Sequence, residues 1–282
     1  MNAPADWSQP LAACPVLALR DVRLRTGQRV LVEHLTMDIG VGQLWCIAGP
    51  NGAGKSTLMT ALAGLRHVDG GSVEIDGKPA AQVAPSALAR QRAYLPQAVH
   101  DTFSMSVLDA VRVGRHPHLS GWGWTGREDD RVVRDTIRAM DIEALAARDV
   151  LTLSGGERQR ASLAAALAQQ APLLLLDEPV SHLDLRHQIL VLEQLAALAR
   201  AGRHAIVVIL HDLTLALRYA THALLMAEDG TALHGAAAEV LTPERCSRAL
   251  RTPIVSVSDG VHTALIPDGA KAPRPFTQDP NP

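Results

Sequence analysis

A glycine-rich segment directly after a short apolar run limits what this chain can fold into more than any other feature. The apolar run is Leu44–Ala48, and the segment is Gly49-Pro50-Asn51-Gly52-Ala53-Gly54-Lys55-Ser56. It matches the pattern G-x-x-x-x-G-K-[ST], in which backbone N–H groups surround phosphate oxygens at the start of a helix. We therefore predict a buried strand, a phosphate-binding loop and a helix, with Lys55 on the outer phosphates and Ser56 holding Mg²⁺.

Other apolar stretches indicate the fold class. Leu173–Leu176 and residues 205–210 are apolar throughout, as expected of parallel strands that are buried on both faces. Residues 16–38 and 72–75 instead alternate apolar and polar side chains around turns, which predicts a small antiparallel sheet. Helical patterns separate the apolar runs, so we expect an α/β core with an antiparallel β subdomain.

Residues 106–148 show helical patterns alone and are predicted to form a helical subdomain. Asp129 and Asp130 stand near the start of one helix, where acidic side chains favour the helix dipole. Its predicted inner face holds Val133, Ile137 and Met140. Residues 114–126 have no period and are predicted to be a loop. We find no internal repeat.

Composition excludes several classes of protein. The 282 residues suffice for one large domain, or for a core with a subdomain. The 27 Lys and Arg nearly balance the 29 Asp and Glu, so no overall basic field exists to hold nucleic acid. Cys14, Cys46 and Cys246 lack the spacing of a disulfide framework or a zinc site, which favours a reducing compartment.

No apolar stretch approaches the roughly 20 residues of a membrane helix, and the first residues lack the pattern of a secretory signal. We therefore expect a soluble, cytoplasmic protein. Residues 1–15 and 268–282 are rich in proline and poor in apolar residues, so a flexible N-terminus and a disordered tail are expected.

Two carboxylates follow the apolar run Leu173–Leu176. The carboxyl edge of a parallel sheet is where α/β folds bind ligands, so Asp177 is expected to face a metal ion. Glu178 would then be placed to accept a proton from an attacking water. The alternative is that two solvated acids simply end a strand.

A second helix start is predicted at Leu153-Ser154-Gly155-Gly156-Glu157. Ser154 and Glu157 form the S-x-x-E pattern of a capping box, and the two glycines leave the backbone N–H groups uncovered. Such a terminus suits an anion. On its own, the segment could equally be an ordinary helix cap.

The order of these motifs resembles that of the ATP-binding subunits of ABC transporters, over about residues 16–267. The resemblance implies a P-loop NTPase cassette with a RecA-like core, an antiparallel β subdomain and a helical subdomain at about residues 98–153. Gln97 would lie near Mg²⁺ and the membrane subunit, Asp184 would end the D-loop Ser181-His182-Leu183-Asp184, and His211 would touch the γ-phosphate.

The site residues implied by the motifs and the resemblance fall into three groups. The catalytic candidates are Glu178, His211 and Gln97, and the Mg²⁺ candidates are Ser56, Gln97 and Asp177. The ATP-binding candidates are Gly49, Pro50, Asn51, Gly52, Ala53, Gly54, Lys55, Ser56, Thr57, Ser154, Gly155, Gly156 and Asp184.

The resemblance also implies partners. The family forms head-to-tail dimers, here a homodimer, in which Ser154, Gly155 and Gly156 of one subunit close over ATP on the other subunit's phosphate loop. It further implies two membrane permease subunits, an indirect link to a periplasmic binding protein, a peripheral position on the cytoplasmic face of the inner membrane, and no nucleic acid.

Three segments resemble the importer subgroup for iron-siderophores, haem and vitamin B12: residues 113–118, 184–188 and 211–220. His116 and His118 in the first segment have no third ligand nearby and are interpreted as loop residues. Two alternatives are an importer ATPase for another substrate class and a non-transport ABC ATPase that acts on DNA or ribosomes. The latter relatives carry a very long coiled coil or two cassettes, and neither pattern is present.

The chain departs from the family pattern where an aromatic residue usually stacks on adenine. The corresponding stretch, Leu24-Arg25-Thr26-Gly27, has none. Arg25 is a candidate to stack on the base, with a solvated arginine as the alternative. In the loop of the helical subdomain, Trp122 and Trp124 either contact the membrane subunit or cover the subdomain's own helices.

Overall fold

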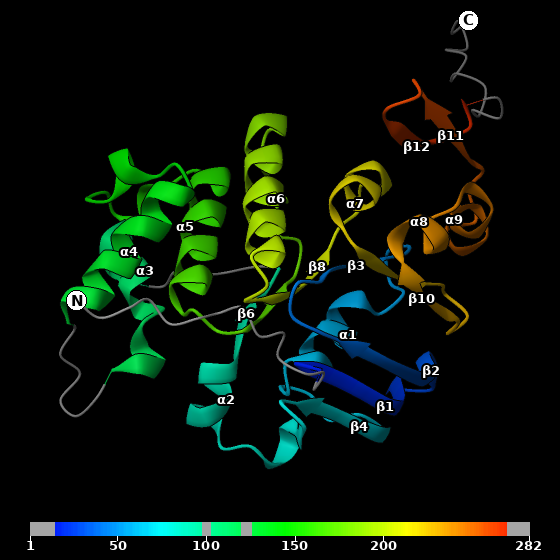
Figure 1. The fold of residues 1–282 in the computed structure, drawn as a ribbon, viewed down its shortest axis with the longest axis horizontal. Helices are drawn as coiled ribbons and strands as arrows, with labels where there is room; N and C mark the ends of the chain where they lie inside the picture. Colours follow the sequence, from blue (N-terminus) through cyan, green and yellow to red (C-terminus); the bar gives the residue numbers. More distant parts are fainter. Residues whose placement is uncertain (1–14, 98–102, 120–125, 270–282) are drawn as a thin grey trace, which may run out of the picture.

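A central six-stranded sheet organises the chain in the computed structural model, which describes residues 15–97, 103–119 and 126–269 (Figure 1). Trp122 and Trp124 lie outside the described residues. The strand order is β10 (Ala232–Ala236), β9 (His222–Met226), β3 (Leu44–Ala48), β8 (Ala205–Ile209), β7 (Leu173–Leu176) and β6 (Arg92–Leu95). All neighbours pair in parallel except β10, which is antiparallel to β9.

The three apolar runs predicted as buried parallel strands are confirmed as β3, β7 and β8. Their side chains divide alternately between two cores, because successive residues of a strand point to opposite faces. Leu174 and Leu176 face the core that includes the helices of residues 103–200, whereas Leu173 and Leu175 face the core that includes the antiparallel sheet. Burial on both faces therefore explains why no polar residue interrupts these runs.

The predicted antiparallel sheet is also confirmed. Its strand order is β2 (Arg29–Ile39), β1 (Leu17–Thr26), β4 (Gly70–Ile75) and β5 (Lys78–Pro79). It lies on the same side of the central sheet as α1 (Lys55–Leu62), and they share one core with Trp45 and Ile47 of β3 (Figure 1). Between β5 and β6 the chain forms η1 (Ala80–Gln82) and α2 (Pro85–Gln91).

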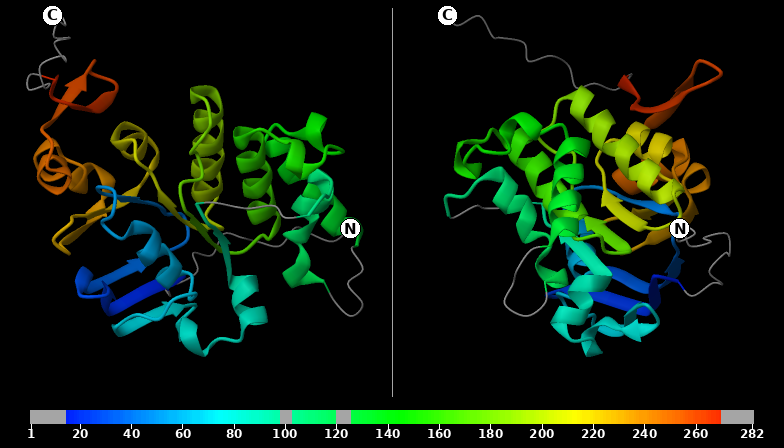
Figure 2. Two further views of the ribbon diagram at one scale, coloured as in Figure 1. Left: turned by 180° about the vertical axis from the view of Figure 1, so that it is seen from behind. Right: turned by 60° about the vertical axis from the view of Figure 1, so that its left-hand side comes forward.

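Helices cover the opposite face of the central sheet, and Figure 2 shows them standing on that side in both views. In chain order they are α3 (Val107–Val113), η2 (His116–His118), α4 (Arg127–Ala139), η3 (Glu143–Leu145), η4 (Val150–Thr152), α5 (Gly155–Ala168) and α6 (Leu185–Arg200). As predicted, Asp129 and Asp130 lie in the first turn of α4, and Val133 and Ile137 are buried.

The predicted loop at residues 114–126 is partly wrong, because His116–His118 form a turn of 3-10 helix. Gly114, which ends α3, sits directly against α5. A Cβ atom at this position would lie 2.0 Å from the carbonyl oxygen of Ala165, so the close approach of the two helices requires glycine there.

The C-terminal part of the described chain contains α7 (Leu213–Tyr219), α8 (Ala237–Val240), α9 (Pro243–Leu250) and a hairpin of β11 (Ile254–Ser258) with β12 (Thr263–Pro267). The hydroxyl of Thr214 in α7 donates to the carbonyl of Leu265 and accepts from its N–H, which fixes the hairpin to α7. Over the described ranges, no helix combines the length and apolar character needed to cross a bilayer.

Candidate nucleotide site

The glycine-rich loop connects β3 to α1, as its sequence predicts. Gly54 precedes α1 with a φ of +97°, and a Cβ on it would lie 2.8 Å from a methyl carbon of Leu31. A Cβ on Gly49 would lie 2.3 Å from the carbonyl oxygen of Met226 in β9. Both positions need glycine because the loop backbone is pressed between β2 and β9.

Lys55 is the buried cation of this loop. Its ammonium group donates hydrogen bonds to the carbonyl oxygens of Gly49 and Pro50, each at 2.9 Å, and the residue is only 6% exposed. Burial lowers the pKa of Lys55, while the nearby carboxylates of Glu178 and Asp177 raise it. The lysine is thus held inside the loop, where phosphate oxygens of a ligand can replace the two carbonyl acceptors.

A cleft of about 350 Å³ runs along the loop. It is lined by predicted residues from the loop, from the segment after β6 and from the end of β7, and by three residues of the β1–β2 hairpin. The lining residues are Thr26, Arg29, Leu31, Asn51, Gly52, Gly54, Lys55, Ser56, Thr57, Gln97 and Glu178. The structure therefore brings together, in one cleft, side chains that are up to 152 positions apart in the sequence.

Asp177 lies beneath this cleft. It is 1% exposed, and its Oδ1 atom has no hydrogen-bond partner among the described residues. Burial raises the pKa of Asp177, and a hydrogen bond from the Ser56 side chain opposes that shift. A buried, unpartnered carboxylate oxygen beside a hydroxyl provides the hard oxygen donors that Mg²⁺ prefers, so these residues fit a magnesium ion.

Glu178 and His211 meet at the end of neighbouring strands β7 and β8. The Nε2 atom of His211 lies 2.6 Å from Oε1 of Glu178, whose side chain is 13% exposed. Glu178 has a φ of +52°, and its carbonyl oxygen accepts hydrogen bonds from Gln159 and from the hydroxyl of Ser181. These bonds hold an unfavourable backbone conformation that directs the carboxylate into the cleft.

Four of the predicted ATP-binding residues lie elsewhere. Ser154 caps α5 in a reciprocal capping box with Glu157, as predicted, and Gly155 and Gly156 form the first turn. Asp184 caps α6 and bonds to the main chain and ring of His187, with its side chain 67% exposed. None of these residues lines the cleft of the same chain.

The hairpin residues Thr26 and Arg29 are lining residues that sequence reasoning missed. They are cross-strand partners, Thr26 at the end of β1 and Arg29 at the start of β2. Arg25, the sequence candidate for stacking on the base, lies instead beside Glu33 at 3.8 Å and does not line the cleft. The alternation of side chains along β1 explains the difference, since adjacent residues face opposite sides.

Comparison with known proteins identifies the family. A family model described as "ABC transporter" matches residues 32–181, more than half of the chain. The chain belongs to the ABC transporter family. The hemin import ATP-binding protein of Thermobifida fusca (strain YX) is 41% identical over 234 residues, which cover 82% of this chain and 81% of that protein. The ferric enterobactin transport ATP-binding protein of Escherichia coli (strain K12) is 37% identical over 249 residues, covering 88% and 92% of the two chains.

A solved structure described as an inward-facing metal-chelate type ABC transporter has a TM-score of 0.77 to this ABC subunit at 27% identity. The match covers 89% of this chain and 97% of that one. The predicted cassette fold is thereby confirmed. ATP-binding proteins of ABC importers are ATPases, so the chain is an ATP-hydrolysing subunit.

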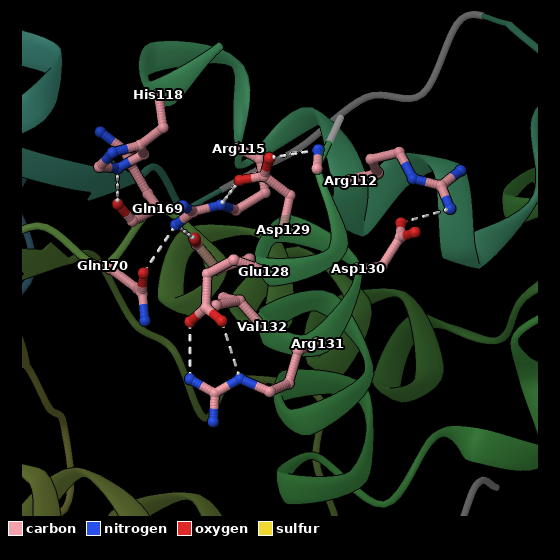
Figure 3. Close-up of polar contacts among 12 residues, drawn as sticks. Arg112, Arg115, His118, Glu128, Asp129, Asp130, Arg131, Val132, Gln169 and Gln170 are labelled. Carbon is pink, nitrogen blue, oxygen red and sulfur yellow. Dashed lines mark hydrogen bonds and ion pairs between the residues drawn. The ribbon is translucent and has the colours of Figure 1, made fainter. Parts of the chain in front are cut away.

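In the ABC subunit, a buried arginine joins η2 and α4 to the C-terminal end of α5 (Figure 3). Arg115 Nε lies 2.8 Å from Oδ1 of Asp129, and its NH1 donates to the carbonyl of Ala168 and to Gln170. The ring of His118 bonds to the main-chain oxygen of Gln169 at 2.6 Å. The contacts of Arg115 and His118 form a clamp that fixes residues 114–118 to α5, the helix that Ser154 caps.

A second, larger hollow of about 500 Å³ lies between α2, β6, α3 and α5. Leu95 and Pro96, directly before Gln97, form part of one wall, and Gly114 and His116 form part of another. Val113 at its edge is 62% exposed. We call this hollow the α3–α5 groove.

Proposed function

We propose that this chain hydrolyses ATP to drive an importer of metal chelates, of the iron-siderophore, haem or vitamin B12 type, across the inner membrane. The named relatives and the metal-chelate type transporter support this substrate class. The observation that carries the proposed chemistry is the meeting of Lys55, Asp177 and Glu178 around one cleft.

The chemistry follows from the positions of these groups. The loop N–H groups and Lys55 bind the phosphates of ATP at the start of α1. Ser56, Asp177 and Gln97 would hold Mg²⁺, which neutralises charge on the β- and γ-phosphates when bound. Glu178 accepts the proton of the water that attacks the γ-phosphorus, and His211 holds that carboxylate in place through the 2.6 Å contact.

The proposal includes a homodimer. The first turn of α5 has a capping serine and two glycines but lies outside its own chain's cleft. Ser154 and Gly155 are exposed, so this helix terminus is accessible to a partner. In a head-to-tail pair, Ser154, Gly155 and Gly156 bind the phosphates of ATP held by the other subunit, and Asp184 lies at the shared interface.

The α3–α5 groove is proposed to take a segment of a permease subunit, one for each of the two ATPase subunits. A segment seated there touches the chain next to Gln97 on one side and the clamp at residues 114–118 on the other. It is thereby linked to the ATP cleft and to the start of α5. The ABC subunit would then sit on the cytoplasmic face of the inner membrane, and a periplasmic binding protein would act on it only through the permease.

Glu178→Gln tests the catalytic assignment. We expect turnover to fall at least about 100-fold, because the amide cannot accept the proton, while ATP affinity changes little. Size-exclusion chromatography with ATP and Mg²⁺ should show a stable dimer. Glu193→Gln, an exposed residue of α6 without a nearby site residue, is the matched control and should hydrolyse ATP like the wild type. Turnover of Glu178→Gln within a few-fold of wild type would assign the base to another group.

A further inference from the structure

The order of strands along the carboxyl edge of the central sheet gives the cleft two distinct ends. Along that edge, Glu228 follows the end of β9, and the phosphate loop follows the end of the neighbouring β3. His211 then follows the end of β8, and Glu178 follows the end of β7. The phosphorus that is attacked must lie near Glu178. The nucleobase therefore extends to the other side of the loop, toward β9 and the β1–β2 hairpin.

Arg29 stands at that second end. Its NH2 group donates a hydrogen bond to the carbonyl oxygen of Glu228 at 3.2 Å, just after β9. Its NH1 atom lies 3.8 Å from the position of a Cβ on Gly52, so the guanidinium passes beside the phosphate loop. Within the described part of the chain, no carboxylate forms an ion pair with it.

The other described residues at this end of the cleft offer no aromatic ring that could stack on the nucleobase. Thr26 and Leu31 are small or aliphatic, and no aromatic side chain is among the described residues that line the cleft. A guanidinium is planar and weakly hydrated and stacks well on flat π systems. Its bond to Glu228 restrains the guanidinium, and Arg29 is exposed, so a ligand can reach the side chain.

We propose that Arg29 binds the nucleobase by laying its guanidinium plane against the purine ring. This inference rests on ATP binding in this cleft. It assigns to Arg29 the role that the sequence had offered to Arg25. Arg25 is turned to Glu33 on the other face of β1, and its N–H bonds to Asp69.

Binding of ADP and of pyrophosphate, which lacks the base, separates the contributions of the two ends. Titration calorimetry on the full chain would compare Arg29→Ala, Arg29→Trp and the control Arg25→Ala with the wild type. We expect Arg29→Ala to weaken ADP binding about tenfold and to leave pyrophosphate binding within twofold. Arg29→Trp keeps a flat partner without the charge and should bind ADP within about threefold of wild type, as should Arg25→Ala.

Two results would overturn the inference. Equal loss of ADP and pyrophosphate affinity in Arg29→Ala, with the same loss in Arg29→Trp, would mean that Arg29 acts as a charge on the phosphates. An unchanged ADP affinity in Arg29→Ala would mean that it does not contact the nucleotide. Lys55→Ala distinguishes these failures from a failure of the proposed function. Normal ADP binding by that variant would mean that the nucleotide does not bind in this cleft. Melting temperatures without nucleotide verify that each variant is folded.

Discussion

Replacing Arg115 with Met removes the guanidinium that joins α4 to α5 and keeps most of the side-chain volume. The arginine side chain is 6% exposed and the Asp129 side chain 16%, so the change leaves a largely buried carboxylate without its cation. The carbonyl of Ala168 also loses a donor. Breaking one side of a buried pair typically costs about 3–5 kcal/mol.

We therefore expect Arg115→Met to lower the free energy of unfolding by about 3 kcal/mol, or the melting temperature by about 6–12 °C. Urea unfolding of the isolated chain at pH 7 is the assay. The matched control is Arg112→Met, since Arg112 is 33% exposed and its partners Asp109 and Asp130 are 57% and 37% exposed, so its loss should cost only about 1 kcal/mol. In the double variant Arg115→Met with Asp129→Asn, the unpaired charge is gone, so part of the loss should be recovered.

The effect depends on pH in a defined direction. The Gly126 N–H and the Arg115 guanidinium lower the pKa of Asp129 below its usual 3.8. A lowered pKa in the folded state stabilises the protein above the unfolded value, and that contribution disappears as the pH falls through the folded value. The difference between wild type and Arg115→Met should thus narrow below about pH 4. A loss no larger than that of Arg112→Met at pH 7 would refute the reasoning.

Two further changes test the packing and the dimer. Gly114→Ala should destabilise the chain by about 1–3 kcal/mol in thermal unfolding, because the new Cβ would lie 2.0 Å from the Ala165 carbonyl oxygen. The control is Gly126→Ala, whose new Cβ would have no contact under 3.6 Å and should cause no such steric loss. Ser154→Arg should abolish ATP turnover but not ATP binding by dilute monomer, and mixing it with Lys55→Ala should restore activity above either variant alone, measured as phosphate release. Loss of ATP binding by the dilute monomer would place Ser154 in its own chain's site.

The phosphate loop and its flanking elements were predictable because local geometry dictates them. Gly49 and Gly54 have positive φ angles of +145° and +97°, and the apolar runs before Gly49 and Asp177 are required by burial on two faces. The sequence alone therefore identified the strands that end at the cleft. The roles of the residues at that edge remain predictions.

Other features depend on contacts between distant segments. Arg29 enters the cleft because the hairpin packs on the turn after β9, a contact that leaves no local pattern in the sequence. Burial of Arg115 depends on its meeting Asp129 and the end of α5. The β11–β12 hairpin was not predicted. Every residue of β11 after Ile254 is exposed, including Val255 at 38% and Val257 at 53%, so the strand lacks the alternating burial of a half-buried strand.

The central sheet divides two hydrophobic cores, so the packing on one face can change without changing the packing on the other. Leu173 and Leu175 pack on the side of α1 and the antiparallel sheet, whereas Leu174 and Leu176 pack on the side of α3 to α6. Substitutions on the helical side can therefore change the proposed permease contact without altering the volume available beneath the phosphate loop. Substitutions at the strand ends, where both faces meet, would instead affect both sides of the sheet.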